Sequence, residues 1–153
     1  MKTVLWKDRS YILNIKEQYR ILEFGEYGDD RGNLVVAECG EDEVPFSVQR
    51  VFYMYGSDKD VIRGQHANRR TEFVLINVCG TSKVRIDNGF ESEVIELNKP
   101  RMGLYIPTMV WKDMYDFSVD SVLLVLASEH YDAEEYIRNY DEYVAEVKYQ
   151  TEC

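Results

Sequence analysis

The sequence predicts an all-β domain, a sandwich or a barrel, followed by one C-terminal α-helix. Short apolar and β-branched runs separated by turn residues recur along most of the chain, a pattern typical of sandwiches and barrels. Near the C-terminus the apolar residues change to a helical period. No linker rich in Pro, Gly or Ser interrupts the 153 residues, so we expect a single domain over residues 1–153.

Each predicted strand is an apolar or β-branched run with turn residues on both sides. The turn 28–32 separates the first two strands, and Asp87-Asn88-Gly89 is typical of a tight β-hairpin. Residues 1–18 carry mixed signals and form an N-terminal extension without an assigned structure. The expected strands are 19–25, 33–38, 47–55, 72–78, 82–87, 92–97, 101–106 and 121–126.

The helix is expected at about residues 132–148. Asp132 suits the N-cap position, and Glu135 stands three residues later, as a capping box requires. We expect the helix to pack its apolar face on the β-domain or on a partner. The residues that recur at helical spacing are Tyr136, Ile137, Tyr140, Val144 and Val147.

Composition and charge exclude several classes of function. The 28 acidic residues against 18 basic ones give a net charge of −10, which opposes nonspecific binding to nucleic acid or to an anionic membrane. No apolar run approaches the ~20 residues of a membrane span, and no signal-peptide pattern opens the chain. The three cysteines show no C-x-x-C spacing, which favours reduced thiols and a cytoplasmic location.

Two histidines, His66 and His130, are the first candidates for chemistry, because imidazole suits proton transfer near neutral pH. In an extended segment, His66 and Asn68 point to the same face. They line an active site, or they belong to an ordinary polar segment that leads into the strand at 72–78. Both interpretations stay open on the residues alone. His130 stands beside the predicted helix start, where a surface or capping role is favoured.

The pattern Gly-x-His-x-Asn-x-x-x-Glu, from Gly64 to Glu72, resembles the first motif of the cupins. In cupins, two histidines and a glutamate of this motif hold a metal ion together with a later histidine. Asn68 occupies the position of the second histidine, and an amide is a poor ligand for a transition metal. The later region 105–112 contains no histidine. The resemblance therefore implies a cupin-type β-barrel or jelly roll that holds no metal.

Three arginines and one tyrosine are candidates for ligand binding. Arg31, Arg50 and Arg63 fall in turns or at strand edges, and a guanidinium group suits phosphate oxygens. For any single arginine, balancing the acidic surface is the favoured interpretation, and for Arg63 both interpretations stay open. Tyr53 lies in the alternating run 52–55, where core packing is one interpretation and orientation of a sugar by a buried hydroxyl is the other.

Several segments in the same order resemble the sugar-nucleotide 3,4-ketoisomerases, small cupins that act on dTDP-4-keto-6-deoxyglucose. They include Pro-Phe-Ser-Val-Gln-Arg-Val-Phe-Tyr at 45–53, Arg-Gly-Gln-His-Ala at 63–67 and Gly-Leu-Tyr-Ile-Pro at 103–107. The resemblance extends from about residue 31 to residue 143. Its other segments are 31–34, 110–111, 114–117, 121–128, 131–132 and 136–140.

This resemblance implies a homodimer that binds a dTDP-linked 4-keto-6-deoxy sugar and uses no cofactor. The implied reaction moves the keto group from carbon 4 to carbon 3 by acid–base enolisation, in the synthesis of 3-amino sugars for surface glycans such as lipopolysaccharide. The implied catalytic residues are His66, Asn68 and Tyr53. The implied substrate-binding residues are Arg31, Arg50, Arg63 and Lys112.

Two positions depart from the family's pattern. The family's motif usually reads His-Ala-His where this chain has His66-Ala67-Asn68, and Lys112 stands where relatives often carry histidine. Because an amide carries no proton, either His66 transfers the proton with help from Tyr53, or the chain is a non-catalytic sugar-nucleotide-binding cupin. A 3- or 3,5-epimerase acting on the same substrate is the third alternative.

Overall fold

The computed structural model describes residues 13–152, so most of the predicted N-terminal extension lies outside the described residues. In its last part, Ile15–Gln18 form the short helix α2, and the Asn14 side chain caps the start of this helix. Ile15 is buried in the main core, so this part of the extension packs with the domain.

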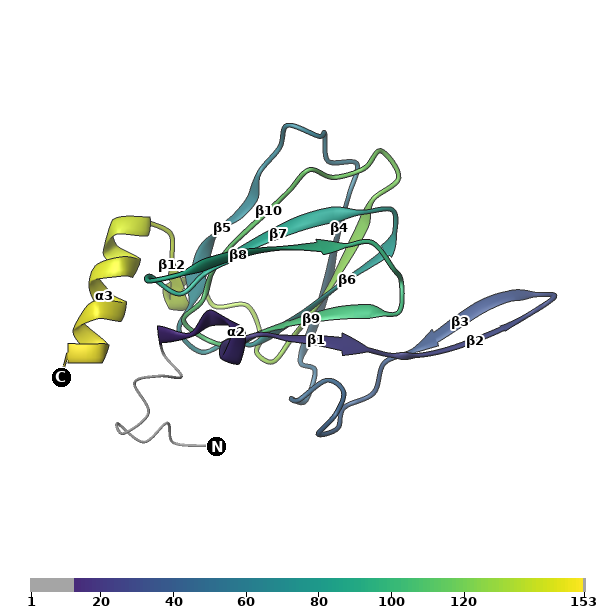
Figure 1. The fold of residues 1–153 in the computed structure, drawn as a ribbon, viewed down its shortest axis with the longest axis horizontal. Coiled ribbons are helices and arrows are strands. Elements are labelled where there is room, and N and C mark those ends of the chain that lie inside the picture. Colours follow the sequence, from purple (N-terminus) through teal and green to yellow (C-terminus); the bar gives the residue numbers. More distant parts are fainter. Residues whose placement is uncertain (1–12, 153) are drawn as a thin grey trace.

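Two five-stranded sheets face each other (Figure 1), and neither closes on itself. The all-β prediction is therefore confirmed as a jelly-roll sandwich, in which the sheets remain separate layers instead of a closed barrel. The first sheet has the order β1 (Arg20–Glu23), β9 (Met102–Ile106), β6 (Phe73–Cys79), β11 (Val122–Ala127) and β4 (Arg50–Tyr55). The second has the order β12 (Tyr136–Ile137), β5 (Arg63–Asn68), β10 (Trp111–Tyr115), β7 (Ser82–Asp87) and β8 (Ser92–Leu97).

The main core lies between these sheets because apolar side chains alternate along the strands. In β7, Val84 and Ile86 are fully buried, whereas Lys83 and Arg85 between and beside them are only half-buried. This period of two is the one that a pleated strand imposes, and it directs one face of each sheet inward. Burial of apolar surface at ~25 cal/mol per Å² then stabilises the two layers against each other.

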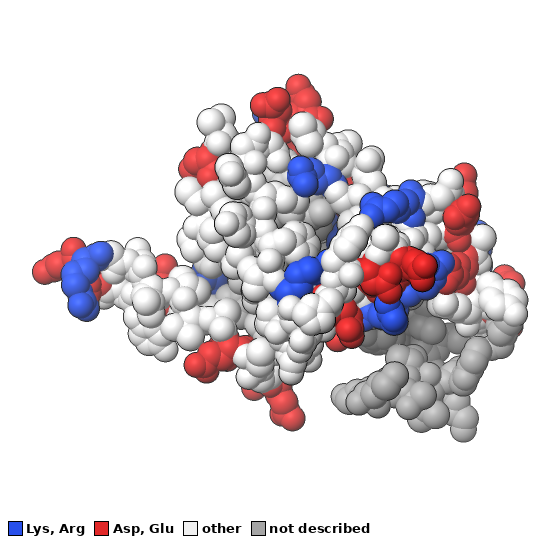
Figure 2. Space-filling view, turned by 180° about the vertical axis from the view of Figure 1, so that it is seen from behind, with Lys and Arg blue, Asp and Glu red and all other residues white. Residues whose placement is uncertain are grey.

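A two-stranded arm, β2 (Gly25–Asp29) and β3 (Gly32–Val36), projects from the sandwich on the side opposite the C-terminal helix (Figure 1). Its strands pair only with each other among the described residues. The predicted turn lies at its tip, where Gly32 has a φ of +117° that suits glycine. Figure 2 shows acidic and basic side chains interspersed over one face of the molecule, with both present at the tip of this arm.

Three strands of the second sheet were not expected, namely β5, β10 and β12. The segment that contains His66 does not lead directly into the strand at 72–78. It forms the separate strand β5, and the chain then bends at 69–72 and crosses to β6 in the other sheet. Trp111–Tyr115 form β10, which lies between β5 and β7 and pairs with both.

The C-terminal helix begins later than predicted. Asp132 does cap a helix, but only the short 3-10 helix Ala133–Glu135. Its side chain accepts a hydrogen bond from the Glu134 backbone amide. Residues Tyr136–Ile137 are then extended as β12, because they pair with β5 and bury Ile137. The α-helix α3 covers Tyr140–Glu152.

Helix α3 is fixed to the sandwich by its buried residues Tyr143 and Val147. The buried Tyr143 hydroxyl lies 2.8 Å from both the Asp87 and the Met109 backbone oxygens. The expectation that the helix packs an apolar face on the β-domain is therefore confirmed. Over residues 13–152, no helix is long and apolar enough to cross a membrane.

Candidate active site between the sheets

A bulge in β5 sets the orientation of His66. Gly64 and Gln65 have φ values of +82° and +54°, and the pairing of β5 with β10 shifts register between Lys112 and Asp113. The His66 Nδ1 atom lies 3.0 Å from the Gly64 carbonyl oxygen. Since a carbonyl oxygen can only accept, Nδ1 carries the proton of the neutral ring and Nε2 keeps its lone pair.

His66 is held in its neutral form. The ring is half-buried, and burial is the main cause that lowers its pKa to about 4. The positive charge of Lys112 lowers the pKa of His66 further, and Arg138 contributes in the same direction. At neutral pH the imidazole is therefore a base with a preset tautomer.

Two tyrosines connect His66 to an arginine on the other sheet. The His66 ring lies 4.8 Å from the Tyr136 ring, and Tyr136 lies 5.6 Å from Tyr131, measured between ring centroids. The Arg50 guanidinium lies over the Tyr131 ring at 5.6 Å, and Arg138 lies over Tyr136 at 4.7 Å. The rings of His66, Tyr136 and Tyr131 thus form one continuous row, which we call the aromatic row. Arg50 and Arg138 lie over its two tyrosines.

Arg50 has buried nitrogens without a protein partner. Its Nε and Nη2 atoms are buried and donate to no acceptor among the described residues, while the guanidinium lies over the rings of Phe52 and Tyr131. A buried donor without a partner is costly. An anion with planar or tetrahedral oxygens would remove this cost, because the guanidinium fork matches such oxygens.

A second polar group lies behind His66, in the interior. The Lys112 ammonium lies 3.3 Å from the Asn68 Oδ1 atom and 4.7 Å from the centroid of the Phe73 ring. On its other side, Asn68 donates from Nδ2 to the Glu135 carboxylate at 2.7 Å. Glu135 also accepts from the Thr71 hydroxyl and from two backbone amides.

Burial changes the ionisation of Lys112 and Glu135 in different ways. Full burial lowers the pKa of Lys112 to about 7, although the charge of Glu135 acts in the opposite direction. Burial alone would raise the pKa of Glu135, but the hydrogen bonds from Thr71, Asn68 and the backbone amides outweigh it and hold the pKa below its usual value. Glu135 is therefore a carboxylate at neutral pH.

The structure brings together only part of the predicted site. His66, Asn68, Lys112 and Arg50 lie at the same end of the sandwich, but Asn68 and Lys112 are 1% and 2% exposed and face the interior. Arg63 is exposed at the start of β5, three residues before His66.

Tyr53 and Arg31 are not in this group within one chain. Tyr53 is 61% exposed, and its ring stacks on that of Tyr55, because Phe52 and Met54 are the residues of β4 that point inward. Within one chain Tyr53 therefore points away from the interior, and its assistance to His66 stays a prediction. Arg31 lies at the tip of the arm, where it pairs with Asp29.

The reduced metal-ligand set of the cupin motif is not assembled either. Glu72 accepts from the Tyr105 hydroxyl, whereas its neighbour Phe73 points into the core. Over residues 13–152, no group of three or more His, Cys, Asp or Glu is arranged to hold a metal ion. His130 is exposed, in keeping with the surface role expected for it.

Tyr131 and Arg138 were not among the predicted site residues, and Tyr136 and Glu135 were assigned to the predicted helix and its cap. Their signal was present, since they lie in or beside segments that carry the resemblance to the ketoisomerases. Glu135 was assigned to a capping box because it stands three residues after Asp132. Only the pairing of β12 with β5 places it beside Asn68.

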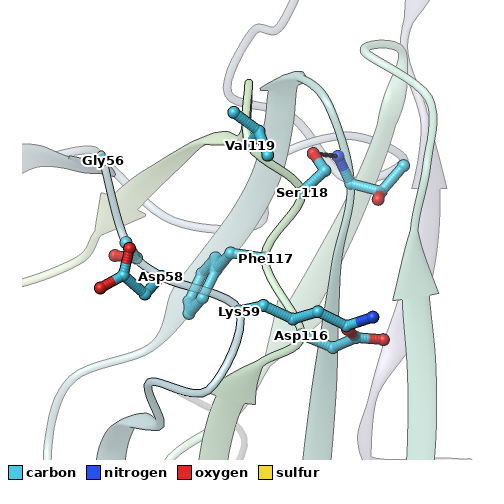
Figure 3. Close-up of a pocket in the computed structure, with 9 residues that line it drawn as sticks. Gly56, Asp58, Lys59, Asp116, Phe117, Ser118 and Val119 are labelled. Carbon is cyan, nitrogen blue, oxygen red and sulfur yellow. Dashed lines mark hydrogen bonds and ion pairs between the residues drawn. The ribbon is translucent and has the colours of Figure 1, made fainter.

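An open hollow of about 510 Å³ lies elsewhere, at the opposite ends of β4 and β10. Figure 3 shows it between the segment that contains Gly56, Asp58 and Lys59 and the segment Asp116 to Val119, with the Phe117 ring between them. Lys59 and Asp116 lie 4.0 Å apart. None of the predicted site residues lines this hollow.

Comparisons with known proteins match almost the whole fold. The family model described as "FdtA: WxcM-like, C-terminal" matches residues 17–148. A TDP-4-oxo-6-deoxy-alpha-D-glucose-3,4-oxoisomerase from Aneurinibacillus thermoaerophilus is 38% identical over 136 residues, which are 87% of this chain and 97% of that protein.

Solved structures of similar proteins agree. QdtA, a sugar 3,4-ketoisomerase from Thermoanaerobacterium thermosaccharolyticum in complex with TDP, is 43% identical with a TM-score of 0.83, over 87% of this chain and 96% of that one. A His-to-Asn mutant of QdtA was solved with TDP-4-keto-6-deoxyglucose. ChmJ, a 3′-monoepimerase from Streptomyces bikiniensis, is 17% identical with a TM-score of 0.68, over 78% of this chain and 68% of that one, and it shares the fold alone.

Proposed function

The chain belongs to the FdtA family of WxcM-like, C-terminal domains, and on this premise we propose that it is a sugar-nucleotide 3,4-ketoisomerase that acts on dTDP-4-keto-6-deoxyglucose. One observation carries the proposal: the aromatic row joins a neutral His66 with a preset tautomer to Arg50, whose buried nitrogens have no partner among residues 13–152. A base and an anion site are thus part of one surface. The relatives with this activity support the choice of substrate.

The proposed chemistry is an enolisation. His66 Nε2 removes the proton from carbon 3 while the electron pair of that C–H bond forms a carbon–carbon double bond and the carbon 4 carbonyl becomes an enediolate. The hydroxyl proton at oxygen 3 passes to the oxyanion at oxygen 4. The imidazolium then returns a proton to carbon 4, where the double-bond electron pair forms the new C–H bond while the carbon 3 carbonyl forms. Atoms and electrons balance without an oxidant, because the substrate and the product are isomers.

The binding roles follow from charge and accessibility. Arg50 is proposed to bind the pyrophosphate, because this half-buried residue carries a positive charge and donors without an acceptor among the described residues. The rings of Tyr131 and Tyr136 offer flat apolar surfaces for the nucleoside or the sugar. Arg63 is exposed at the rim and is proposed as a second contact to the phosphates. Asn68 and Lys112 are buried, so their roles are exerted through the groups that they contact.

The test uses dTDP-4-keto-6-deoxyglucose in deuterated water with ring-proton NMR of the products. The wild type is expected to form a 3-keto sugar with deuterium at carbon 4. His66→Asn should lower turnover by at least the ~10²-fold that deletion of a general base typically costs. His130→Asn, an exposed control at the chain's other histidine, should leave turnover unchanged.

The alternatives predict different results in the same experiment. A non-catalytic binding protein would bind the nucleotide sugar and release it unchanged. An epimerase would return a 4-keto sugar with inverted configuration at carbon 3, or at carbons 3 and 5. If the His66→Asn variant turns over and incorporates deuterium at the wild-type rate, His66 is not the base.

A homodimer is the second part of the proposal, and the arm supports it. Tyr27 and Leu34 on the arm are 64% and 60% exposed, an unusual exposure for large apolar residues on a paired strand. The edge strand β4 presents Tyr53 and Tyr55 in the same way. We place the arm of one copy along β4 of a second copy, where edge pairing and apolar contact cover both surfaces.

This arrangement would give Arg31 a role that it lacks within one chain. The guanidinium at the tip of the arm would then reach the site of the other copy. Leu34→Asp should convert the dimer into a monomer in light scattering, whereas Val119→Asp, at a fully exposed position away from the arm, should not change the mass. A monomeric wild type at micromolar concentration would contradict the dimer without affecting the proposed reaction.

A further inference from the structure

Lys112 and His66 are direct neighbours on adjacent antiparallel strands. They are paired in the register of β10 and β5, and residues opposite each other in such a pair point to the same face. Asn68 lies two residues further along β5 and shares this face. The ammonium group of Lys112 is therefore held on the same side of the sheet as the His66 ring, toward the interior.

The position of this ammonium group is fixed from both sides. Its hydrogen bond goes to Asn68 Oδ1, and the Phe73 ring of the facing sheet lies against it. The Asn68 amide cannot turn over, because its NH₂ group would then face Lys112 and its oxygen would face the Glu135 carboxylate. Glu135 in turn is held by Thr71 and two backbone amides.

We propose that Lys112 is a positioning residue for the base, whose ammonium group opposes protonation of the His66 imidazole and so keeps it ready to accept the carbon 3 proton. This inference rests on the proposed function only in naming His66 as the base. Lys112 is 2% exposed and acts through the field at His66 instead of touching the substrate. The substrate-binding role expected for Lys112 is thereby replaced.

The charged groups that face His66 agree with this role. Arg138, which follows β12, adds a second positive charge, whereas Glu135 of the 3-10 turn opposes both. Glu135 stays charged, but its effect on the pKa of His66 is smaller than that of either cation, so the two cations outweigh it. Below pH 7 Lys112 is mostly protonated, which is the pH range in which His66 would otherwise take up a proton.

The two departures from the family's motif, Asn68 and Lys112, are thus in direct contact and depend on each other. Asn68 and Lys112 are hydrogen-bonded to each other, and an amide, unlike an imidazole, has no protonated form that would be a second cation beside the ammonium group. A neutral amide accepts from Lys112 and donates to Glu135 at the same time. The asparagine allows a buried ammonium group where a second histidine would oppose it.

The experiment is a pH titration of the histidine ring protons by NMR, on protein without a histidine tag. Only two histidines contribute signals, and His130→Gln assigns them. Lys112→Gln and Lys112→Met both remove the positive charge, one with a polar and the other with an apolar side chain. In both variants the pKa of His66 should rise by about one unit, the effect typical of one nearby charge. In Lys112→Arg it should stay near the wild-type value, and His130 should titrate alike in all four proteins.

The outcome does not depend on the reaction. If the pKa of His66 is the same in folded Lys112→Gln or Lys112→Met as in the wild type, Lys112 does not act on the base and the inference is overturned. Where the ketoisomerase reaction is observed, the acid limb of kcat/KM should shift upward with the NMR pKa. If the NMR shift is present and no 3-keto product forms, the inference stands and the proposed function fails.

Discussion

Replacing Glu135 by Gln tests the buried hydrogen bonds that support the site. The wild-type carboxylate accepts on one oxygen from Asn68 Nδ2 at 2.7 Å and from the Thr71 hydroxyl. Its other oxygen accepts from the Arg70 and Thr71 backbone amides at 2.7 and 3.1 Å. A glutamine keeps one oxygen, which must stay with the two amides because these cannot rotate.

The glutamine NH₂ group then faces the NH₂ group of Asn68. Asn68 cannot relieve this contact by turning over, since that would place its NH₂ group against the Lys112 ammonium. One hydrogen bond to a charged group is lost and two buried donors face each other, which should cost about 2–4 kcal/mol. For a chain of this length, this corresponds to a fall in Tm of roughly 5–12 °C.

Thermal unfolding followed by circular dichroism at pH 7 measures this effect. Glu134→Gln, at the exposed neighbouring position, is the matched control and should unfold within ~1 °C of the wild type. Because the folded state lowers the pKa of Glu135, its contribution is present above the usual pKa of 4.5 and is lost as the pH falls further. The difference between variant and wild type should therefore shrink below pH 4. An E135Q protein as stable as the control at pH 7 would refute this account of the network.

Two further changes test the backbone and the buried charge. Gly64→Ala should destabilise the fold by at least ~2 kcal/mol in urea unfolding and lower turnover, because a Cβ there would lie 2.8 Å from Met114 Cε and 2.9 Å from the Lys112 carbonyl oxygen at a φ of +82°. A wild-type stability would show that the bulge adapts. Lys112→Met should raise Tm at pH 7, because the lowered pKa of Lys112 destabilises the folded wild type as long as the lysine of the unfolded chain is protonated. This destabilisation decreases as the pH approaches 10.5, so the difference in Tm between variant and wild type should become smaller there. A gain that is constant with pH would contradict a lowered pKa at Lys112.

The strands that the sequence predicts best are those with a clear alternation of apolar and polar residues. The expected ranges 82–87 and 92–97 coincide with β7 and β8, and the turn between them begins at Asp87 as its Asn-Gly pair indicates. Alternation is a local property of such a hairpin, so it can be found in the sequence. The arm was found only in part, because its first strand carries two glycines and two acidic residues and buries nothing.

The helix start illustrates a conflict between local and long-range interactions. Asp132 and the spacing from Tyr136 onward favour a helix from residue 132. Pairing of Tyr136 and Ile137 with β5 satisfies their backbone groups and buries Ile137, which a helix at this position would not do. The actual helix then starts after Asn139, whose side chain accepts from the Glu142 amide.

The segments that sequence analysis misassigned are the segments that build the site, and this has a physical reason. Strand β10 carries Lys112 and strand β5 carries His66 and Asn68, so polar residues stand at positions where a strand pattern expects apolar ones. Such residues are stable between the sheets only because each finds its partner on another strand or turn. Those partners, Glu135 above all, are distant in the sequence and leave no periodic signal. An interruption in the alternation of apolar and polar residues inside an otherwise regular jelly roll therefore indicates where polar side chains of a functional site replace apolar packing.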